Sequence, residues 1–421
     1  MDRIYQSNAV YVGGRFVPAG IHVSKGRIAG VLPLSSPTPA VPISDNFNLI
    51  WLPGLADVHV HLREPGFSYK ETMESGTAAA AAGGFTSVCA MPNLDPVPDS
   101  PAGLRPQLTR ISAGSRVHVF PYGALTYGRQ GKEPSDMEGL APYVCAFSDD
   151  GSGVREDDVM RDCMLRAKRL GKVVAAHCED TSLLGGKHIH DGTYAAKTGR
   201  KGISSESEWR QVERDLHLAA ETGCAYHVCH VSTKESVQLI REAKRAGLDV
   251  TCETAPHYLL LCEDDLQEEG RFKMNPPLRG RADREALLAG LCDGIIDMIA
   301  TDHAPHSAEE KSGGLDGSAM GVVGLETAFA ALYTGLVKAG VLPLERLVYL
   351  MHDAPARRFS LDGGIEAGKP ADLTAFDLSC RWTVEPERFC SKGRATPFAG
   401  AELSGKCILT IVDGKIVFEN R

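Results

Sequence analysis

Short apolar runs recur through the middle of the chain, about 20 to 50 residues apart, with helix-like segments such as 157–170 and 234–246 between them. The eight runs are residues 49–58, 85–91, 117–120, 144–147, 173–176, 225–228, 250–252 and 295–300. Eight strand–helix units in about 300 residues predict an α/β fold, a (β/α)8 TIM-type barrel. A doubly wound open sheet is the alternative, but no Gly-x-Gly-x-x-Gly turn follows the first run, which counts against it.

Both ends of the chain show a different pattern, of short strands separated by turns. Gly13-Gly14 separates two apolar runs near the start. Asp413-Gly414 lies between the runs 408–412 and 415–418, and Asp-Gly in that position is typical of a hairpin. Neither end is long enough to bury a core alone. We therefore predict a small β domain built from residues 1–51 and 362–421, and a barrel from residues 52–361.

Composition narrows the class of protein. The chain has 421 residues, of which 43% are hydrophobic and 24% charged, as in ordinary globular proteins. A net charge of −9 without a long basic run argues against nucleic acid or an anionic membrane as partner. No apolar segment approaches the ~20 residues of a membrane span. Twelve cysteines without a CxxC pair, and a start without a secretory signal pattern, predict a cytoplasmic protein with reduced thiols.

Polar side chains cluster where the apolar runs end. His59 and His61 lie two residues apart at the end of the first run, so they share one face of a strand. In barrels of this kind the chemistry sits at the carboxyl ends of the strands. The same position in later runs is taken by Asp150, His177, His230 and Asp302. Four imidazoles and two carboxylates at one level predict a metal site, for which zinc is a suitable ion.

Six ligands exceed the number that one tetrahedral zinc needs. Two metals bridged by a carboxylate, or one metal with spare ligands, both fit the pattern. Such a centre lowers the pKa of bound water from 15.7 to roughly 7 and polarises a carbonyl, so we expect hydrolysis, or its reverse, at a carbonyl carbon. Asp302 is placed to act as general base on the water and then as proton donor to a leaving nitrogen.

Other polar residues near these strand ends are candidates for binding a substrate. Arg63 follows His61 by two residues, and its planar fork suits a carboxylate. Asn93, Asn275 and His306 lie at expected loop positions. The glycine-rich segment 306–319 is either a lid over the site or a solvated loop. His227 lies three residues before His230, and we expect it to face away from the site.

Several segments together resemble the dihydroorotases of the amidohydrolase superfamily. They are DVHVHLREPG (57–66), MPN (91–93), DDG (149–151), AHCE (176–179), HVS (230–232), KMNPPLR (273–279), ATDHAPH (300–306) and GKPADL (368–373). The resemblance spans the whole predicted barrel and extends into the small β domain. The segments 62–66 and 302–306 are specific to this group.

The resemblance implies interconversion of N-carbamoyl-L-aspartate and L-dihydroorotate in pyrimidine (UMP) biosynthesis, with one or two zinc ions per chain. It implies that His59, His61 and Asp302 hold one zinc, that His177 and His230 hold the second, and that Asp150 bridges them. Many amidohydrolases use a carbamylated lysine as the bridge, but this strand ends in Ser148-Asp149-Asp150. Spacing to His177 selects Asp150, although on physical grounds Asp149 could also reach.

The resemblance also assigns substrate contacts and partners. Arg63, Asn93 and His306 would hold the substrate carboxylate, Asn275 would touch the ring, Met320 and Gly321 would offer backbone groups, and His61 would border the substrate. A homodimer is expected from base rates, and association with aspartate transcarbamoylase is a further expectation.

Two alternative functions are retained. An allantoinase or hydantoinase would act on rings that lack the carboxylate Arg63 is expected to bind, and such enzymes usually carry the bridging lysine. A non-catalytic dihydroorotase-like partner of aspartate transcarbamoylase would have lost metal ligands, whereas this chain retains all six candidates.

Overall fold

A computed structural model describes residues 2–34, 43–45, 48–186 and 188–420. Its centre is a set of parallel strands in two hydrogen-bonded groups. The first group contains β6 (Leu55–Val60), β7 (Phe85–Ala90) and β8 (His118–Pro121). The second contains β9 (Val174–Ala176), β10 (Tyr226–Val228), β11 (Val250–Thr254) and β12 (Met298–Ile299).

Isolated parallel bridges join the two groups. Phe147, in the predicted fourth run, bridges Gly123 on one side and Val174 on the other. On the opposite flank, His303 bridges Val60. The strands therefore follow one another around a ring in chain order, which confirms the predicted (β/α)8 barrel and excludes the doubly wound sheet. Residues 144–147 form no regular strand, so the isolated bridges of Phe147 take the place of a fourth strand in the ring.

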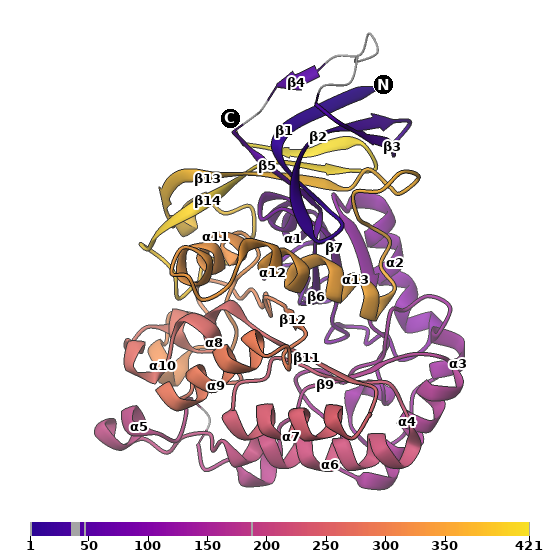
Figure 1. Cartoon of the computed structure of the whole chain (residues 1–421). Helices are drawn as coiled ribbons and strands as arrows, with labels where there is room; N and C mark the ends of the chain where they lie inside the picture. The colour runs from indigo at the N-terminus through magenta and orange to yellow at the C-terminus, as the bar shows by residue number, and fades with distance from the viewer. Residues whose placement is uncertain (1, 35–42, 46–47, 187, 421) are drawn as a thin grey trace.

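Helices follow the strands and surround them (Figure 1). The longer ones are α1 (Met73–Ala82), α2 (Pro101–Gly114), α4 (Asp157–Arg169), α6 (Glu206–Thr222), α7 (Lys234–Arg245) and α9 (Arg281–Cys292). Shorter helices are α3 (Met137–Leu140), α5 (Thr193–Thr198), α8 (Pro256–Leu260), α10 (Gly314–Gly317), α11 (Ala328–Leu332), α12 (Leu344–Val348) and α13 (Ala354–Phe359). The predicted helices at 157–170 and 234–246 correspond to α4 and α7.

Helix α7 shows why the sequence forms these elements. Thr233 caps it by accepting a hydrogen bond from the Ser236 backbone N–H. Val237 and Ile240, three residues apart, are buried on the face that contacts the barrel. Basic residues in the last turn of the helix complement its dipole.

A second sheet combines both ends of the chain, coloured indigo and yellow in Figure 1. Its order is β15 (Lys415–Glu419), β14 (Glu402–Val412), β13 (Leu373–Thr383), β5 (Ile50–Pro53), β1 (Arg3–Val12), β2 (Arg15–Ser24) and β3 (Arg27–Leu32), with β4 (Ile43–Asp45) also paired to β1. The expected hairpins at Gly13-Gly14 and Asp413-Gly414 are both present. The sheet packs on the barrel helices, where Thr410 donates a hydrogen bond to the Ala81 carbonyl at 2.7 Å. The exact domain limits stay a prediction.

The expectation that residues 49–58 form one barrel strand is wrong. The run divides at Gly54 into β5, which pairs with β13 and β1, and β6, which begins the barrel. Trp51 explains the division, because its fully buried ring packs against Tyr5 in the core of the small sheet, 4.7 Å between centroids. The Pro53-Gly54 dipeptide, which stands at the junction of the two strands, was the available sequence signal for this boundary.

The structure adds two findings on the class of protein. All twelve cysteines are free thiols. Among the residues that the structure describes, no helix has the length and apolar character needed to cross a membrane.

The Gly54→Ala substitution tests the close contact at the division between the two sheets. An added Cβ would lie 2.0 Å from Thr86 Oγ1, so the chain must shift. We expect a loss of about 1–3 kcal/mol in the free energy of unfolding, seen as a lower thermal midpoint. The control is Gly30→Ala on β3, where an added Cβ meets nothing within 4 Å. Equal midpoints for the two variants would contradict the assigned packing.

Candidate metal centre

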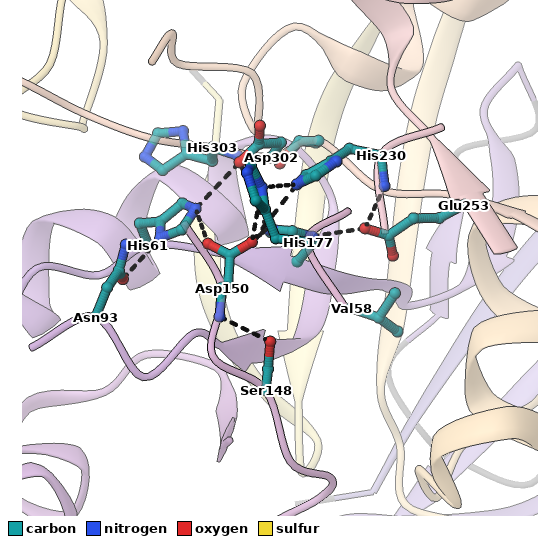
Figure 2. A network of polar contacts seen from close by, with 12 residues as sticks. Val58, His61, Asn93, Ser148, Asp150, His177, His230, Glu253, Asp302 and His303 are labelled. Atoms are coloured by element: carbon teal, nitrogen blue, oxygen red, sulfur yellow. Dashed lines mark hydrogen bonds and ion pairs between the residues drawn. The ribbon is translucent and has the colours of Figure 1, made fainter. Parts of the chain in front are cut away.

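Asp150 lies at the centre of the predicted ligands (Figure 2). Its Oδ1 is 3.3 Å from His59 Nε2, 3.5 Å from His230 Nε2 and 3.8 Å from His177 Nδ1. Its Oδ2 is 3.6 Å from His61 Nε2. The strands β6, β9 and β10 each end at this point, so one carboxylate meets imidazoles from three strand ends. The structure thus brings the four predicted histidines together around a single acid.

The neighbouring acid, Asp149, faces elsewhere. Its carboxylate accepts hydrogen bonds from the backbone N–H groups of Leu125, at 2.8 Å, and Thr126, at 3.1 Å, and from the Thr126 hydroxyl. Asp150 is turned into the cluster, and its own backbone N–H donates to Ser148 Oγ at 3.0 Å. Of the two acids, Asp150 is therefore the one that faces the imidazoles, and its role as a metal ligand stays a prediction.

Asp302 follows β12 and completes the cluster. Its Oδ1 lies 3.1 Å from His61 Nε2 and 3.6 Å from His59 Nε2. Three residues at the site have positive φ values, which residues other than glycine seldom adopt: +49° for Asp302, +32° for His230 and +59° for Arg63. Such backbone strain concentrates at functional sites, where surrounding contacts hold it in place. These residues leave regular strand geometry in order to face the cluster.

Several buried atoms in the cluster lack a hydrogen-bond partner. They are His59 Nε2, Asp150 Oδ1 and His177 Nε2. Buried polar atoms are otherwise almost always paired. Two sets of ligand atoms lie within 4.8 Å of one another, His59 with His61 and Asp302, and His59 with Asp150 and His230. His177 adjoins the second set, with Nδ1 2.9 Å from His230 Nε2. The donor chemistry and the unpaired atoms fit a divalent metal ion.

Glu253 on β11 supports the cluster from inside the barrel. Its Oε1 accepts a hydrogen bond from His59 Nδ1 at 2.6 Å, and its Oε2 lies 3.0 Å from His227 Nε2. With the proton of His59 on Nδ1, the lone pair of Nε2 faces Asp150. Glu253 was not predicted from the sequence, although a carboxylate within the apolar residues of β11 was a usable signal.

The expectation that His227 faces away from the site is wrong. His227 is fully buried inside the barrel. It hydrogen-bonds to Glu253, which in turn hydrogen-bonds to His59. Counting three residues to His230 assumed regular strand alternation. His230 has a positive φ, so the alternation ends before it. His257 is also buried, with its ring 4.1 Å from that of Tyr258.

Opposite charges within the cluster shift the pKa values of its members. Burial lowers the pKa of His59, but the carboxylates of Asp150 and Glu253 outweigh burial and leave that pKa well above its ordinary value. Burial raises the pKa of Asp150, but His59 and the other imidazoles hold it well below its usual range. For His61, burial outweighs its carboxylate neighbours and lowers the pKa.

A cavity of about 240 Å³ opens onto the cluster. Its lining includes the remaining candidates, namely Arg63, Asn93, Asn275, His306, Met320 and Gly321, together with His61, Asp150, His177, His230 and Asp302. His59 lies deeper and is fully buried. The structure thus places eleven of the twelve predicted site residues around one space, with the twelfth beneath it.

Arg63 and His306 lie side by side in the wall of this cavity, and only Arg63 carries a charge. Burial lowers the pKa of Arg63 to about 10, which leaves it charged at neutral pH. Its Nε donates to the Pro305 carbonyl at 3.1 Å, and its Nη2 lies 3.4 Å from His306 Nε2. Burial, followed by the charges of Arg63 and Lys70, lowers the pKa of His306 to about 3, so this imidazole is neutral.

The two asparagines have supporting contacts that the sequence analysis did not include. Asn93 Oδ1 accepts from His61 Nδ1 at 2.8 Å, which turns His61 Nε2 toward Asp302. Asn275 Nδ2 donates to Glu179 Oε1 at 3.1 Å, and Glu179 Oε2 lies 3.8 Å from His177 Nε2. Glu179 belongs to the AHCE segment, where the sequence analysis gave it no role. Each asparagine therefore links the cavity wall to an imidazole of the cluster.

Comparisons with known proteins agree with this site. A family model described as "Dihydro-orotase-like" matches residues 48–236. Dihydroorotases from Bacillus cytotoxicus and Bacillus cereus are 49% and 48% identical over 409 residues, which is 96% of this chain and 95% of each relative.

Solved structures show the same fold. An L-hydantoinase (dihydropyrimidinase) from Arthrobacter aurescens has a TM-score of 0.88 at 26% identity, covering 99% of this chain and 96% of that one. A dihydropyrimidinase from Brevibacillus agri has a TM-score of 0.87 at 22% identity, covering 100% and 95%. The identity to the sequence relatives, across almost their full length, decides between these groups. The chain therefore belongs to the dihydroorotase family, a family of cyclic amide hydrolases.

Proposed function

We propose that this chain is a zinc-dependent dihydroorotase, which interconverts L-dihydroorotate and N-carbamoyl-L-aspartate in pyrimidine biosynthesis. One observation carries the proposal: a buried cluster of imidazoles and carboxylates shares its cavity with the Arg63 guanidinium. The cluster suits attack on an amide carbonyl, and the guanidinium suits the carboxylate that dihydroorotate carries.

The ligands divide into two sets about Asp150. We infer that His59, His61 and Asp302 hold one zinc, that His177 and His230 hold a second, and that Asp150 bridges. Asp150 supports this role because both of its oxygens face imidazoles, Oδ1 toward His59 and His230 and Oδ2 toward His61. An aspartate in this position would replace the carbamylated lysine of many relatives.

Zinc held there would lower the pKa of water and polarise the ring carbonyl of the substrate. The residues of the chain provide orientation and proton transfer. Arg63 binds the substrate carboxylate, with Asn93 and His306 beside it, while Asn275 and the backbone at Met320 and Gly321 border the ring. Asp302 accepts the proton of the attacking water. As the carbon–nitrogen bond of the ring amide breaks, Asp302 returns that proton to the leaving nitrogen.

The likeness to hydantoinase structures makes hydantoin hydrolysis the second candidate. Its TM-score of 0.88 reports the shared fold. Arg63 favours the first candidate, because its buried charge would face no carboxylate in a hydantoin. The cytoplasmic location, the homodimer and the association with aspartate transcarbamoylase stay predictions.

Removal of metal is the first test. Protein treated with a chelator and dialysed should lose at least about 100-fold in the rate of dihydroorotate hydrolysis, since a metal ion supplies several kcal/mol to such reactions. Added zinc should restore the rate, and zinc content should be measured beside it. Zinc-loaded protein that does not turn over dihydroorotate would refute the proposal.

Glu253→Gln tests the support of His59. The neutral amide keeps an acceptor for His59 Nδ1 but removes the charge that makes the imidazole a stronger ligand. We expect zinc affinity, measured by competition with a chromophoric chelator, to fall about 10–100-fold. The control is Glu285→Gln, at an exposed position of α9. Unchanged affinity in the Glu253 variant would remove Glu253 from the account.

Arg63→Met tests substrate choice. Loss of a charge-assisted hydrogen bond worth about 1.5–3 kcal/mol should raise KM for dihydroorotate about 10–100-fold. Hydantoin has no carboxylate, so its slower hydrolysis should change little. Zinc content should match that of the unaltered protein, as evidence of an intact centre. A wild-type preference for hydantoin over dihydroorotate would favour the second candidate.

A further inference from the structure

Lys311 lies in the segment 306–319, for which the sequence left two interpretations open, a lid or a solvated loop; the cavity wall continues from it to Gly321. Its half-buried ammonium group contacts three backbone carbonyls. Nζ lies 3.0 Å from Lys273 O, 2.8 Å from Ala319 O and 2.7 Å from Gly321 O. An ammonium group has three N–H donors, so these carbonyls account for all of them. The adjacent acid, Glu310, pairs instead with Lys70 at 2.8 Å.

The three carbonyls come from two separate loops of the cavity wall. Lys273 begins the loop that carries Asn275. Ala319 and Gly321 flank Met320 in the segment that follows β12. Lys273 O also accepts a hydrogen bond from the Gly321 N–H at 3.1 Å. Asn275, Met320 and Gly321 all line the cavity. The Lys311 side chain therefore joins two walls that face the substrate, beside this backbone hydrogen bond and one from Lys273 Nζ to Asp316 O at 2.7 Å.

The backbone at Gly321 has little space around it. Its φ is +134°, and an added Cβ would lie 2.7 Å from Ala304 O. On its other side, His306 Nε2 donates to Met320 O at 2.7 Å. The Met320–Gly321 backbone is thus held between His306 and Lys311, with little room to adjust.

Placing the ammonium here has an electrostatic cost, which a generic surface lysine does not have. Burial, and then the nearby charge of Lys273, lowers the pKa of Lys311 to about 7. The three carbonyl dipoles are the compensation that the structure provides. A neutral side chain of similar length would remove that cost but would also lose all three contacts.

The outer side of the same segment is held at the surface through Asp316, whose backbone carbonyl also accepts a hydrogen bond from Lys273 Nζ at 2.7 Å. Arg200 forms ion pairs with Asp316 and Glu268, at 2.9 and 2.8 Å, on the surface. These contacts hold the segment without touching the carbonyls beside the cavity. Arg200 therefore offers a control that separates general anchoring of the segment from the spacing of the cavity walls.

We propose that Lys311 is a positioning residue, which sets the width of the substrate cavity by joining the Asn275 loop to the Met320–Gly321 backbone. The proposal rests on the proposed function and deepens it, because it concerns how tightly that cavity fits its ring substrate. It also assigns the segment 306–321 as a closed wall of the site and not as a solvated loop.

Lys311→Met tests the proposal in the zinc-loaded, full-length protein. A misplaced wall should lower kcat/KM for dihydroorotate about 10–100-fold, mainly through KM, with zinc content unchanged. Lys311→Arg retains charge and donors and should recover part of that loss. Arg200→Met should stay within about threefold of the unaltered protein. Values for Lys311→Met within twofold of wild type, or equal losses in the Lys311 and Arg200 variants, would overturn the proposal.

Hydrogen exchange provides a readout that is independent of activity. In Lys311→Met, backbone amides of both 273–279 and 306–321 should exchange faster, whereas Arg200→Met should affect the second segment alone. If wild-type protein fails to hydrolyse dihydroorotate, the proposed function is wrong, and exchange still decides whether Lys311 joins the two loops. Unchanged exchange at 273–279 in the Lys311 variant would show that it does not.

Discussion

The carboxylate of Asp150, buried among four imidazoles, is the contact on which the site depends. A buried anion is unfavourable unless positive charge and hydrogen bonds compensate it. Here the compensation comes from residues on strand ends that are far apart in sequence, so it exists only when the barrel closes. Fold and chemistry are therefore coupled: the ring of strands creates the cluster, and a cation between its members would in turn stabilise the ring.

The surrounding contacts keep these ligands in one arrangement. Glu253 fixes the ring of His59, Asn93 fixes the ring of His61, and Ser148 holds the backbone of Asp150. Asp57 accepts hydrogen bonds from the His59 and Thr301 backbone N–H groups, which ties the first strand to the last where the barrel closes. The cavity wall is organised in the same way, with Lys311 joining two loops. Function in this chain thus depends also on groups such as Glu253, Ser148 and Asp57, which would touch neither metal nor substrate.

The sequence predicted the barrel and the twelve residues around its mouth, because strand-end positions follow from apolar periodicity and the motifs are specific. Three features were not predicted. The division at Gly54 was missed because Trp51 and Leu55 serve different cores within one apolar run, although Pro53-Gly54 marks the boundary. His227 was misplaced because the positive φ of His230 breaks strand alternation. Glu253 and Lys311 act through contacts with residues far away in sequence, and these partners are known only once the chain is folded.

X-ray diffraction with anomalous scattering at the zinc edge, on zinc-loaded crystals, is the most direct test of the central claim. The account predicts metal density on either side of the Asp150 carboxylate, with ligand distances of about 2.0–2.2 Å to the imidazole nitrogens and carboxylate oxygens. It also predicts that Asp149 remains bonded to Thr126 and makes no contact with metal. Anomalous density located elsewhere, or none in the cluster at saturating zinc, would contradict the account.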